Sequence, residues 1–203
     1  MDVSIHPSRD GQEVRHGVIK SRPFQKLKGF SLIELLVTIT LIAIAISIGV
    51  PGYQSLISSN RLTASINQLR GALALTRSEA VHRNQHVAIC HSLDGSQCSR
   101  RGNWSDGWII FVDKNRDKFI DETDEIINIY QTINKSVSIN YRAFGSRHYV
   151  VYRPSGFTLT NGTFTVCSPK NTTLKKALIL TKSGRVRLSK VQDDGKELEC
   201  EDD

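Results

Sequence analysis

An apolar run from Phe30 to Val50 constrains the fold of this 203-residue chain more than any other feature. Its 21 residues include a single formal charge, Glu34. As a helix that rises about 1.5 Å per residue, the run would reach roughly 32 Å, which is enough to cross a bilayer. A basic stretch precedes it, with Lys20, Arg22, Lys26 and Lys28. Because positive flanks stay in the cytoplasm, we expect a single-pass anchor with the rest of the chain on the other side.

Glu34 is the unusual residue of this run, because a carboxylate inside a membrane helix costs about 3 kcal/mol. One interpretation places it near the headgroups, where the start of the helix dipole favours negative charge. The other depends on the whole hexapeptide Gly29-Phe30-Ser31-Leu32-Ile33-Glu34. Before an apolar run of this length, that hexapeptide resembles the type IV prepilin signal. We favour the second interpretation.

The prepilin resemblance implies a set of partners. A prepilin peptidase would cut between Gly29 and Phe30, and the new Phe30 amine would be methylated. In that family the glutamate equivalent to Glu34 neutralises the N-terminal amine of a neighbouring subunit, which gives a buried carboxylate its cation. The resemblance thus implies an inner-membrane protein with a periplasmic head. Its N-terminal helix would join other pilins, and the assembled pilus would carry it to the cell surface.

The predicted organisation has four parts. Residues 1–29 are polar and basic without an apolar centre, so they differ from an ordinary secretory signal and are assigned as the prepilin leader. Residues 30–57 are the transmembrane and filament-core helix, residues 58–192 the globular head, and residues 193–203 an acidic tail.

The helical pattern continues beyond the apolar run. Pro51 removes one backbone hydrogen bond and should kink the helix without ending it. We expect one long helix from Phe30 to about His82, whose second half lays an apolar stripe on a sheet. That stripe comprises Leu62, Ile66, Leu69, Leu73 and Val81.

Short runs of β-branched and aromatic residues follow Asn84 and predict strands. Asn161-Gly162 indicates a hairpin between residues 157–160 and 163–167, and Ser183-Gly184 indicates a turn between residues 178–182 and 185–190. The predicted fold is therefore α+β and type IV pilin-like, with a long N-terminal helix packed on an antiparallel β-sheet head. The predicted strands are 86–90, 108–113, 125–131, 136–141, 149–153, 163–168, 177–181 and 185–189.

All four cysteines follow the predicted anchor, and an even number on the exported side suggests two disulfides. Proximity favours Cys90–Cys98 and therefore Cys167–Cys200, although three connectivities are possible. A zinc site is the alternative, which the lack of a Cys-x-x-Cys pair disfavours.

A second resemblance lies between Trp104 and Asp117. This stretch is similar to the Gly-Trp-x-x-Phe-x-Asp-x-Asn pattern of the FimT/GspH branch of minor pilins and pseudopilins. We expect Trp104 and Trp108 to be core or loop anchors. The stretch also opens a possible calcium loop, whose register would use Asp113, Asn115, Asp117, Asp121 and Asp124.

Two features argue against calcium in this loop. Lys118 stands where the sharp turn needs glycine, and Asp124 is short for bidentate binding. We therefore expect a solvated acidic loop and predict neither a metal nor a cofactor.

Charge is strongly segregated along the C-terminal part of the chain. Residues 126–192 contain eleven Lys or Arg and no acid, whereas residues 193–203 contain seven acids and one lysine. If much of residues 126–192 forms one sheet face, the head presents a positive surface that attracts polyanions such as nucleic acid.

Within this basic stretch, the predicted nucleic-acid contact is the segment Lys182-Ser-Gly-Arg-Val-Arg187. Side chains alternate along a strand, so Arg185 and Arg187 would share a face about 7 Å apart, roughly the spacing of phosphates along one DNA strand. Gly184 would let the turn approach a ligand closely. The element also looks like the Gly-Arg-x-Arg of FimT-type minor pilins that bind DNA during natural transformation. The resemblance implies Arg185 and Arg187 as main contacts, supported by Lys182, Lys190, Lys175 and Lys176.

Other interpretations of this basic segment remain open. Charged residues protect exposed sheet edges from unwanted pairing. The acidic tail could also lie on the basic face, neutralise it and act as a DNA mimic. Tyr141, Tyr149 and Tyr152 could stack on unpaired bases, although we favour packing within the sheet.

We find no catalytic motif and expect that the protein is not an enzyme. His82, His86 and His91 are expected to be ordinary surface residues. Two functions stay open: a FimT-type minor pilin that binds DNA without sequence preference for natural transformation, or a structural minor pilin or GspH-type pseudopilin of type II secretion or pilus assembly. The basic segment favours the first.

Overall fold

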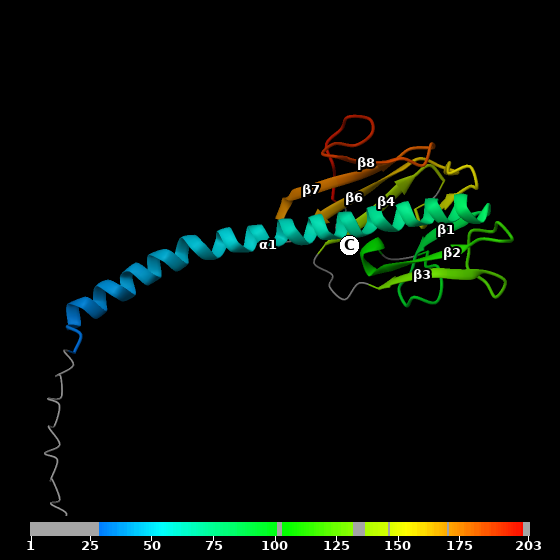
Figure 1. Ribbon diagram of the computed structural model, residues 1–203. Coiled ribbons are helices and arrows are strands. Elements are labelled where there is room, and N and C mark those ends of the chain that lie inside the picture. Colours follow the sequence, from blue (N-terminus) through cyan, green and yellow to red (C-terminus); the bar gives the residue numbers. More distant parts are fainter. Residues whose placement is uncertain (1–28, 101–102, 132–136, 146, 170, 201–203) are drawn as a thin grey trace, which may run out of the picture. The chain divides into compact units, whose positions relative to one another are not determined.

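The computed structural model describes residues 29–100, 103–131, 137–145, 147–169 and 171–200. The regular elements in these residues are one long α-helix, a short 3₁₀ helix and the strands of two antiparallel sheets (Figure 1). The predicted leader lies outside these residues except for Gly29. The chain divides between Ile44 and Ala45 into two compact units. The predicted domain boundaries at residues 57 and 192 stay predictions.

Helix α1 runs from Leu32 to Arg83. It begins with a cap, because the Ser31 hydroxyl accepts a hydrogen bond of 3.2 Å from the Glu34 backbone N–H. Glu34 therefore lies in the first turn, where the helix dipole favours its charge. The described apolar side chains before Ala45 are exposed.

The strands form two four-stranded sheets, and every pairing is antiparallel. The first sheet has the order β3-β2-β1-β5 and the second the order β4-β6-β7-β8. A short 3₁₀ helix, η1 (Trp104–Asp106), leads into β2. The strand bounds are β1 Val87–His91, β2 Gly107–Val112, β3 Glu125–Gln131, β4 Ser138–Ala143, β5 Tyr149–Tyr152, β6 Gly162–Ser168, β7 Asn171–Leu180 and β8 Val186–Ser189.

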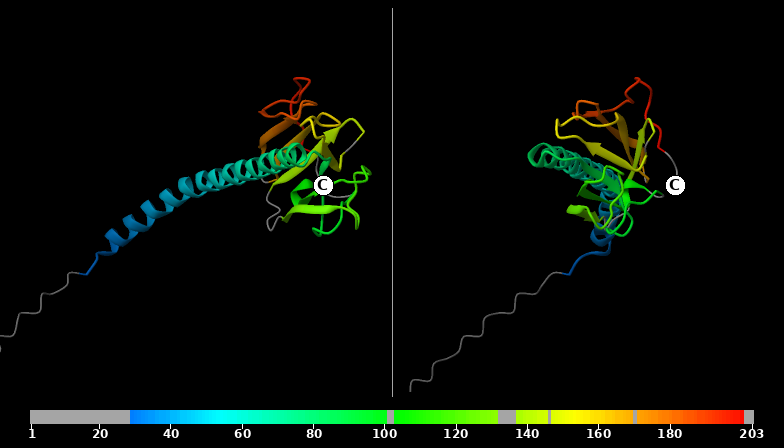
Figure 2. Two further views of the ribbon diagram at one scale, coloured as in Figure 1. Left: turned by 45° about the vertical axis from the view of Figure 1, so that its right-hand side comes forward. Right: turned by 90° about the vertical axis from the view of Figure 1, so that its right-hand side faces the viewer.

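The second half of α1 lies along both sheets, as both figures show (Figures 1 and 2). Its buried face joins the inner faces of the two sheets in one apolar core. The helix contributes the predicted Leu62, Ile66, Leu69 and Leu73, together with Ala72 and Ala80. Trp104 and Trp108 are 2% and 1% exposed, so both are core anchors as expected. These findings confirm the predicted α+β fold.

Two predicted details are wrong. Val81 is 51% exposed, because at about 3.6 residues per turn the stripe that begins at Leu62 reaches Ala80 and not Val81. Residues 157–160 form no hairpin with β6, which pairs with β4 and β7; Thr158 makes only an isolated bridge to Tyr152. Asn161-Gly162 is therefore not a hairpin turn: β6 pairs instead with β7, the next strand in the sequence, and with β4, which precedes β5.

The two predicted disulfides are present, Cys90–Cys98 and Cys167–Cys200. The first fastens a loop on the outer face of the first sheet, where Cys98 packs against a small apolar cluster. The second fastens the C-terminal segment to β6 of the second sheet. Both therefore stabilise loops that leave the common core.

Candidate nucleic-acid interface

The predicted turn at Ser183-Gly184 connects β7 to β8, which is the edge strand of the second sheet. We call residues 181–190 the basic hairpin. Its turn is closed by hydrogen bonds of 2.9 Å from Gly184 N to Thr181 O and 3.0 Å from Thr181 N to Arg185 O. Gly184 has a φ of +76°, and a Cβ there would collide with the carbonyl of Gly156. Glycine is therefore required for both backbone conformation and packing.

The turn rests on residues that are distant in sequence. The Lys182 carbonyl accepts a 2.9 Å hydrogen bond from Thr158 N. The Gly184 carbonyl lies 3.5 Å from both Arg77 Nη1 of α1 and the Tyr152 hydroxyl of β5. Burial raises the pKa of Tyr152, so its hydroxyl keeps its proton and donates. Sequence reasoning missed Arg77 because its partner is more than one hundred residues away.

Strand register determines which basic side chains share a face. Arg187 pairs with Ile179, whose side chain lies on the outer face of the second sheet, whereas Leu188 pairs with the inward Leu178. Arg185 is two positions from Arg187 along the extended chain, so alternation places both on the outer face. Lys182, Arg185 and Lys190 are exposed, and the Arg187 side chain is 52% exposed.

Lys175 and Lys176 are separated by the same alternation. Lys175 pairs with Cys167 and shares the outer face with Ala177 and Ile179. Lys176 is the next residue along β7 and therefore lies on the opposite face. Of the two lysines predicted to support DNA binding, only Lys175 therefore shares the outer face with the basic hairpin. Lys176 lies on the other side of the sheet.

The acidic tail lies over the outer face, which confirms that part of the alternative interpretation. Asp193 Oδ1 lies 2.7 Å from Arg187 Nη2, and Glu197 Oε1 lies 2.6 Å from Lys175 Nζ. The hydrogen bond from Lys175 lowers the pKa of Glu197. Leu198 is buried against Ala177 and Ile179, next to the Cys167–Cys200 disulfide. An apolar contact and a covalent bond therefore hold the tail in place.

The basic residues of 126–192 do not form a single sheet face, contrary to the expectation. Strands β3 and β5 of this stretch belong to the first sheet and β4, β6, β7 and β8 to the second. Arg147 and Arg153 consequently flank β5, which belongs to the first sheet, whereas Arg187 lies in the second. Lys135 and Lys170 lie outside the described residues. The positive charge is therefore divided among several surfaces.

The predicted processing site lies at the other end of the chain. Gly29 and Phe30 lie just before Ser31, the residue that caps α1, and Phe30 is 81% exposed. Glu34 is exposed within the first helical turn. Cleavage, methylation and the contact with a neighbouring amine stay predictions.

The acidic loop closes on itself by hydrogen bonds. The Asn115 side-chain amide donates to Asp117 at 3.1 Å and to Asp121 at 2.6 Å, while Asp124 accepts 3.0 Å and 3.2 Å bonds from the backbone N–H groups of Lys114 and Asp121. Lys118 has a φ of +74°, the conformation that the glycine of a calcium loop supplies. Within the described residues, no three acidic, histidine or cysteine side chains are arranged to hold a metal ion.

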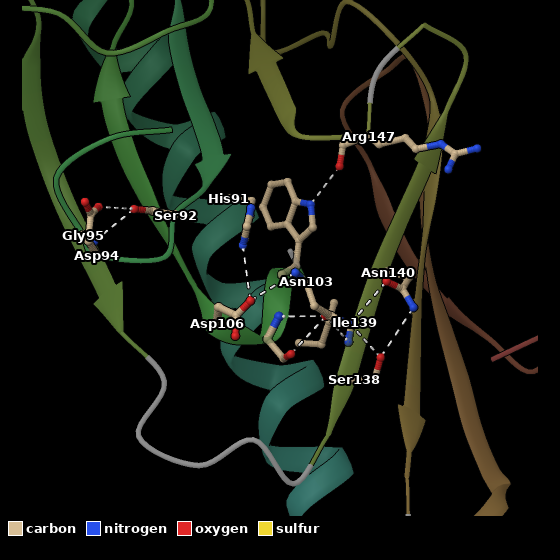
Figure 3. Close-up of polar contacts among 12 residues, drawn as sticks. His91, Ser92, Asp94, Gly95, Asn103, Asp106, Ser138, Ile139, Asn140 and Arg147 are labelled. Carbon is tan, nitrogen blue, oxygen red and sulfur yellow. Dashed lines mark hydrogen bonds and ion pairs between the residues drawn. The ribbon is translucent and has the colours of Figure 1, made fainter. Parts of the chain in front are cut away.

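A buried polar network joins the two sheets at the Trp104–Trp108 stretch (Figure 3). The Asn103 side-chain oxygen accepts hydrogen bonds from Ser105 N and from Ile139 N of β4, at 3.1 Å and 2.7 Å. The Trp104 indole donates a 3.1 Å bond to the Arg147 carbonyl. The residues that resemble the tryptophan pattern therefore connect the two sheets.

His91 lies in this network and is fully buried, so the expectation of a surface residue is wrong. Its Nε2 lies 3.7 Å from Asp106 Oδ2 (Figure 3). Burial lowers the pKa of His91 and outweighs the attraction of Asp106. Its strand is covered on both faces, which no alternation in the sequence indicated.

Taken together, an apolar N-terminal helix and a disulfide-bonded antiparallel head define a pilin-like protein. In the described part of the chain, α1 alone is long and apolar enough to cross a membrane, with a mean hydropathy of 2.5 in its apolar window. Residues 25–50 match the prokaryotic N-terminal methylation motif, and residues 65–188 match the family described as type II transport protein GspH. The chain belongs to the GspH family of minor pilins and pseudopilins. No curated protein matches it significantly.

Solved structures of two such proteins resemble the chain. The type IV minor pilin FimU of Pseudomonas aeruginosa is 18% identical with a TM-score of 0.48, over 64% of this chain and 89% of FimU. The minor pseudopilin EpsH of the Vibrio cholerae type 2 secretion system is 11% identical with a TM-score of 0.45, over 63% of this chain and 94% of EpsH.

Proposed function

We propose that this protein is a minor type IV pilin that binds extracellular DNA without sequence preference, through the basic hairpin, for uptake in natural transformation. The observation that carries the proposal is the position of Arg187 in the edge strand β8 and of Arg185 directly before that strand, where side-chain alternation gives both the same face and Gly184 fixes the turn. Guanidinium groups contact phosphates without reading bases, so binding would be independent of sequence and weakened by salt.

The supporting geometry has three parts. Lys182 and Lys190 are exposed at the two ends of the same hairpin and extend its positive charge. β8 is the last strand of the second sheet, so within that sheet no described strand pairs with the edge of β8 that faces away from β7. The turn rests on α1 and on the β5–β6 connection, which holds both arginines in a defined place. Preorganised contacts lose less entropy when they bind.

The remaining parts of the proposal concern the cell. A prepilin peptidase would cleave before Phe30, and the inner membrane would hold the anchor with the head in the periplasm. Glu34 would pair with the amine of another pilin during assembly, after which the pilus presents the head at the cell surface. Several copies in one filament would raise a weak affinity by avidity. In this proposal the protein has no catalytic role.

A second candidate function is that of a structural minor pilin or GspH-type pseudopilin that binds no DNA. Two observations favour it: the matching family is described as a type II transport protein, and Arg187 and Lys175 already pair with Asp193 and Glu197. In that case the basic hairpin serves only to protect a sheet edge.

The two functions differ in what a charge-neutral hairpin does in cells. We would replace the chromosomal gene with the Arg185→Gln/Arg187→Gln variant and measure transformation frequency, pilus number and secretion. A large loss of transformation with normal pili and secretion supports DNA uptake. Normal transformation, or a loss of pili or secretion to the same degree, contradicts it. An Arg61→Gln/Arg70→Gln variant, on the exposed side of α1, removes the same charge and serves as the control.

A further inference from the structure

A pocket lined by aromatic and basic side chains lies at the end of β5 that is remote from the basic hairpin. Its volume is about 520 Å³. Tyr149, the first residue of β5, lines the pocket, whereas Tyr152, the last, contacts Gly184 of the hairpin. The two sites are therefore separate. The side chains that matter are Arg100, Phe119, Phe144, Arg147, His148 and Tyr149.

Phe144 is the most unusual residue of this pocket. It is 94% exposed, more than any other large apolar side chain in the described part of the chain. It sits in the turn between β4 and β5, beside Gly145, whose φ is +80°. Leaving a phenylalanine ring in water forfeits the favourable free energy of burying it, so the exposed ring calls for a ligand that covers it.

Cations already lie against the other aromatic rings of the pocket. The Arg100 guanidinium lies 4.5 Å from the centre of the Phe119 ring, and Lys118 Nζ lies 5.6 Å from that of Tyr149. The Phe119 and Tyr149 rings themselves meet edge to face at 6.4 Å. None of the described lining residues is acidic. The pocket thus presents ring faces and positive charge together.

The backbone around the pocket is held firmly. The His91 N–H donates a 2.9 Å hydrogen bond to the His148 carbonyl, and the Trp104 indole holds the Arg147 carbonyl. The Arg147 guanidinium points away from that network (Figure 3). On the other side, Ser99 N donates to His91 O at 2.8 Å next to the Cys90–Cys98 disulfide, which anchors the segment carrying Arg100.

We propose that this pocket binds an unpaired nucleotide of single-stranded DNA, with the base stacked on Phe144 and a phosphate between Arg100 and Arg147. A nucleotide matches both halves of the lining, because every base has a π-face and every phosphate is an anion. Burial is the largest cause that lowers the pKa of His148, and repulsion from His91, Arg147 and Arg100 adds to it. The proposal rests on DNA binding as proposed above and extends it to the single-stranded form.

The test compares two single strands of equal length and phosphate number, oligo-dT and its abasic analogue, with a duplex as the third probe. Full-length protein in non-ionic detergent is titrated against each probe. A stacked base contributes about 1–3 kcal/mol, so wild-type protein should bind oligo-dT at least about fivefold more tightly than the abasic strand. Phe144→Leu keeps an apolar side chain but removes the ring, and should reduce this ratio to near one. Phe144→Tyr should preserve it.

Affinity for the duplex shows whether the nucleotide pocket and the basic hairpin bind DNA independently. The Phe144 variants should leave duplex binding unchanged, whereas Arg185→Gln/Arg187→Gln should weaken it and leave the dT-to-abasic ratio intact. A wild-type ratio of one overturns the nucleotide site even if duplex binding is strong, and would favour an acidic segment of a neighbouring protein as the occupant. A high ratio that survives Phe144→Leu also overturns it.

Discussion

Nη2 of Arg187 lies 2.7 Å from Oδ1 of Asp193, and the two side chains are 52% and 55% exposed. An ion pair this exposed contributes only about 0.2–1 kcal/mol. A phosphate can therefore displace Asp193 at modest cost. In the proposed function, the acidic tail would therefore compete with DNA for the basic hairpin without blocking it.

Weakening that contact should strengthen DNA binding. We expect Asp193→Asn to raise affinity for a duplex about threefold at low salt, because it frees Arg187 and costs no folding contact in the core. Asp194→Asn is the matched control: it removes the same charge from the adjacent residue, whose carboxylate pairs within the tail with Lys196 at 3.0 Å. If both variants raised duplex affinity equally, net charge alone would explain the change, and the ion pair between Arg187 and Asp193 would have no effect of its own.

In the proposed function, the conformation of the turn at Gly184 is a second determinant of DNA binding. Gly184→Ala places a Cβ against the Gly156 carbonyl at a φ of +76°. We expect a loss of about 3 kcal/mol in the free energy of unfolding and weaker duplex binding, although every charge is retained. Gly145→Ala has a similar φ of +80° but open space around the new Cβ, so it should cost only about 1 kcal/mol. Denaturant titration measures both, and an equal cost would contradict the packing argument.

Stability should fall as the pH decreases from 7 to 5. Burial lowers the pKa of His91 below its ordinary 6.5, so in this window the unfolded chain binds more protons than the folded one. His86 and His148 also have lowered pKa values, chiefly through burial, and contribute in the same direction. The hydrogen-bonded carboxylate of Asp94, with a pKa of about 2, titrates far below the window.

His91→Gln tests the source of this dependence. Glutamine stays neutral at both pH values, so the variant should lose less free energy of unfolding between pH 7 and pH 5 than the wild type. The measurement is denaturant unfolding at the two pH values. An unchanged difference would assign the effect to the other histidines.

Local patterns in the sequence predicted the elements well, because helices and strands follow from apolar periodicity. The long helix, its residues Leu62 to Leu73 and the turn at Gly184 are all local signals. The division into two sheets was not predictable in this way, because strands β3 to β6 alternate between sheets through pairings distant in sequence. For the same reason, the sequence did not predict that the basic residues of 126–192 are divided between the two sheets.

Site residues show the same contrast. Arg185 and Arg187 followed from strand alternation and a short motif. Arg77 and Gly156, which support the turn, come from other elements and carry no motif of their own. His91 looked like a surface residue because burial of both faces of β1 depends on the disulfide loop and on the Asn103 network.

DNA binding by the basic hairpin is tested most directly by titrating full-length protein in non-ionic detergent with a short duplex at two salt concentrations. Wild-type protein is compared with Arg185→Gln/Arg187→Gln and with the charge-matched Arg61→Gln/Arg70→Gln. We predict that affinity falls as salt rises, that the hairpin variant binds about tenfold or more weakly, and that the helix variant binds nearly as well as wild type. Absence of wild-type binding at low salt, or equal losses in both variants, would contradict a DNA site on this hairpin.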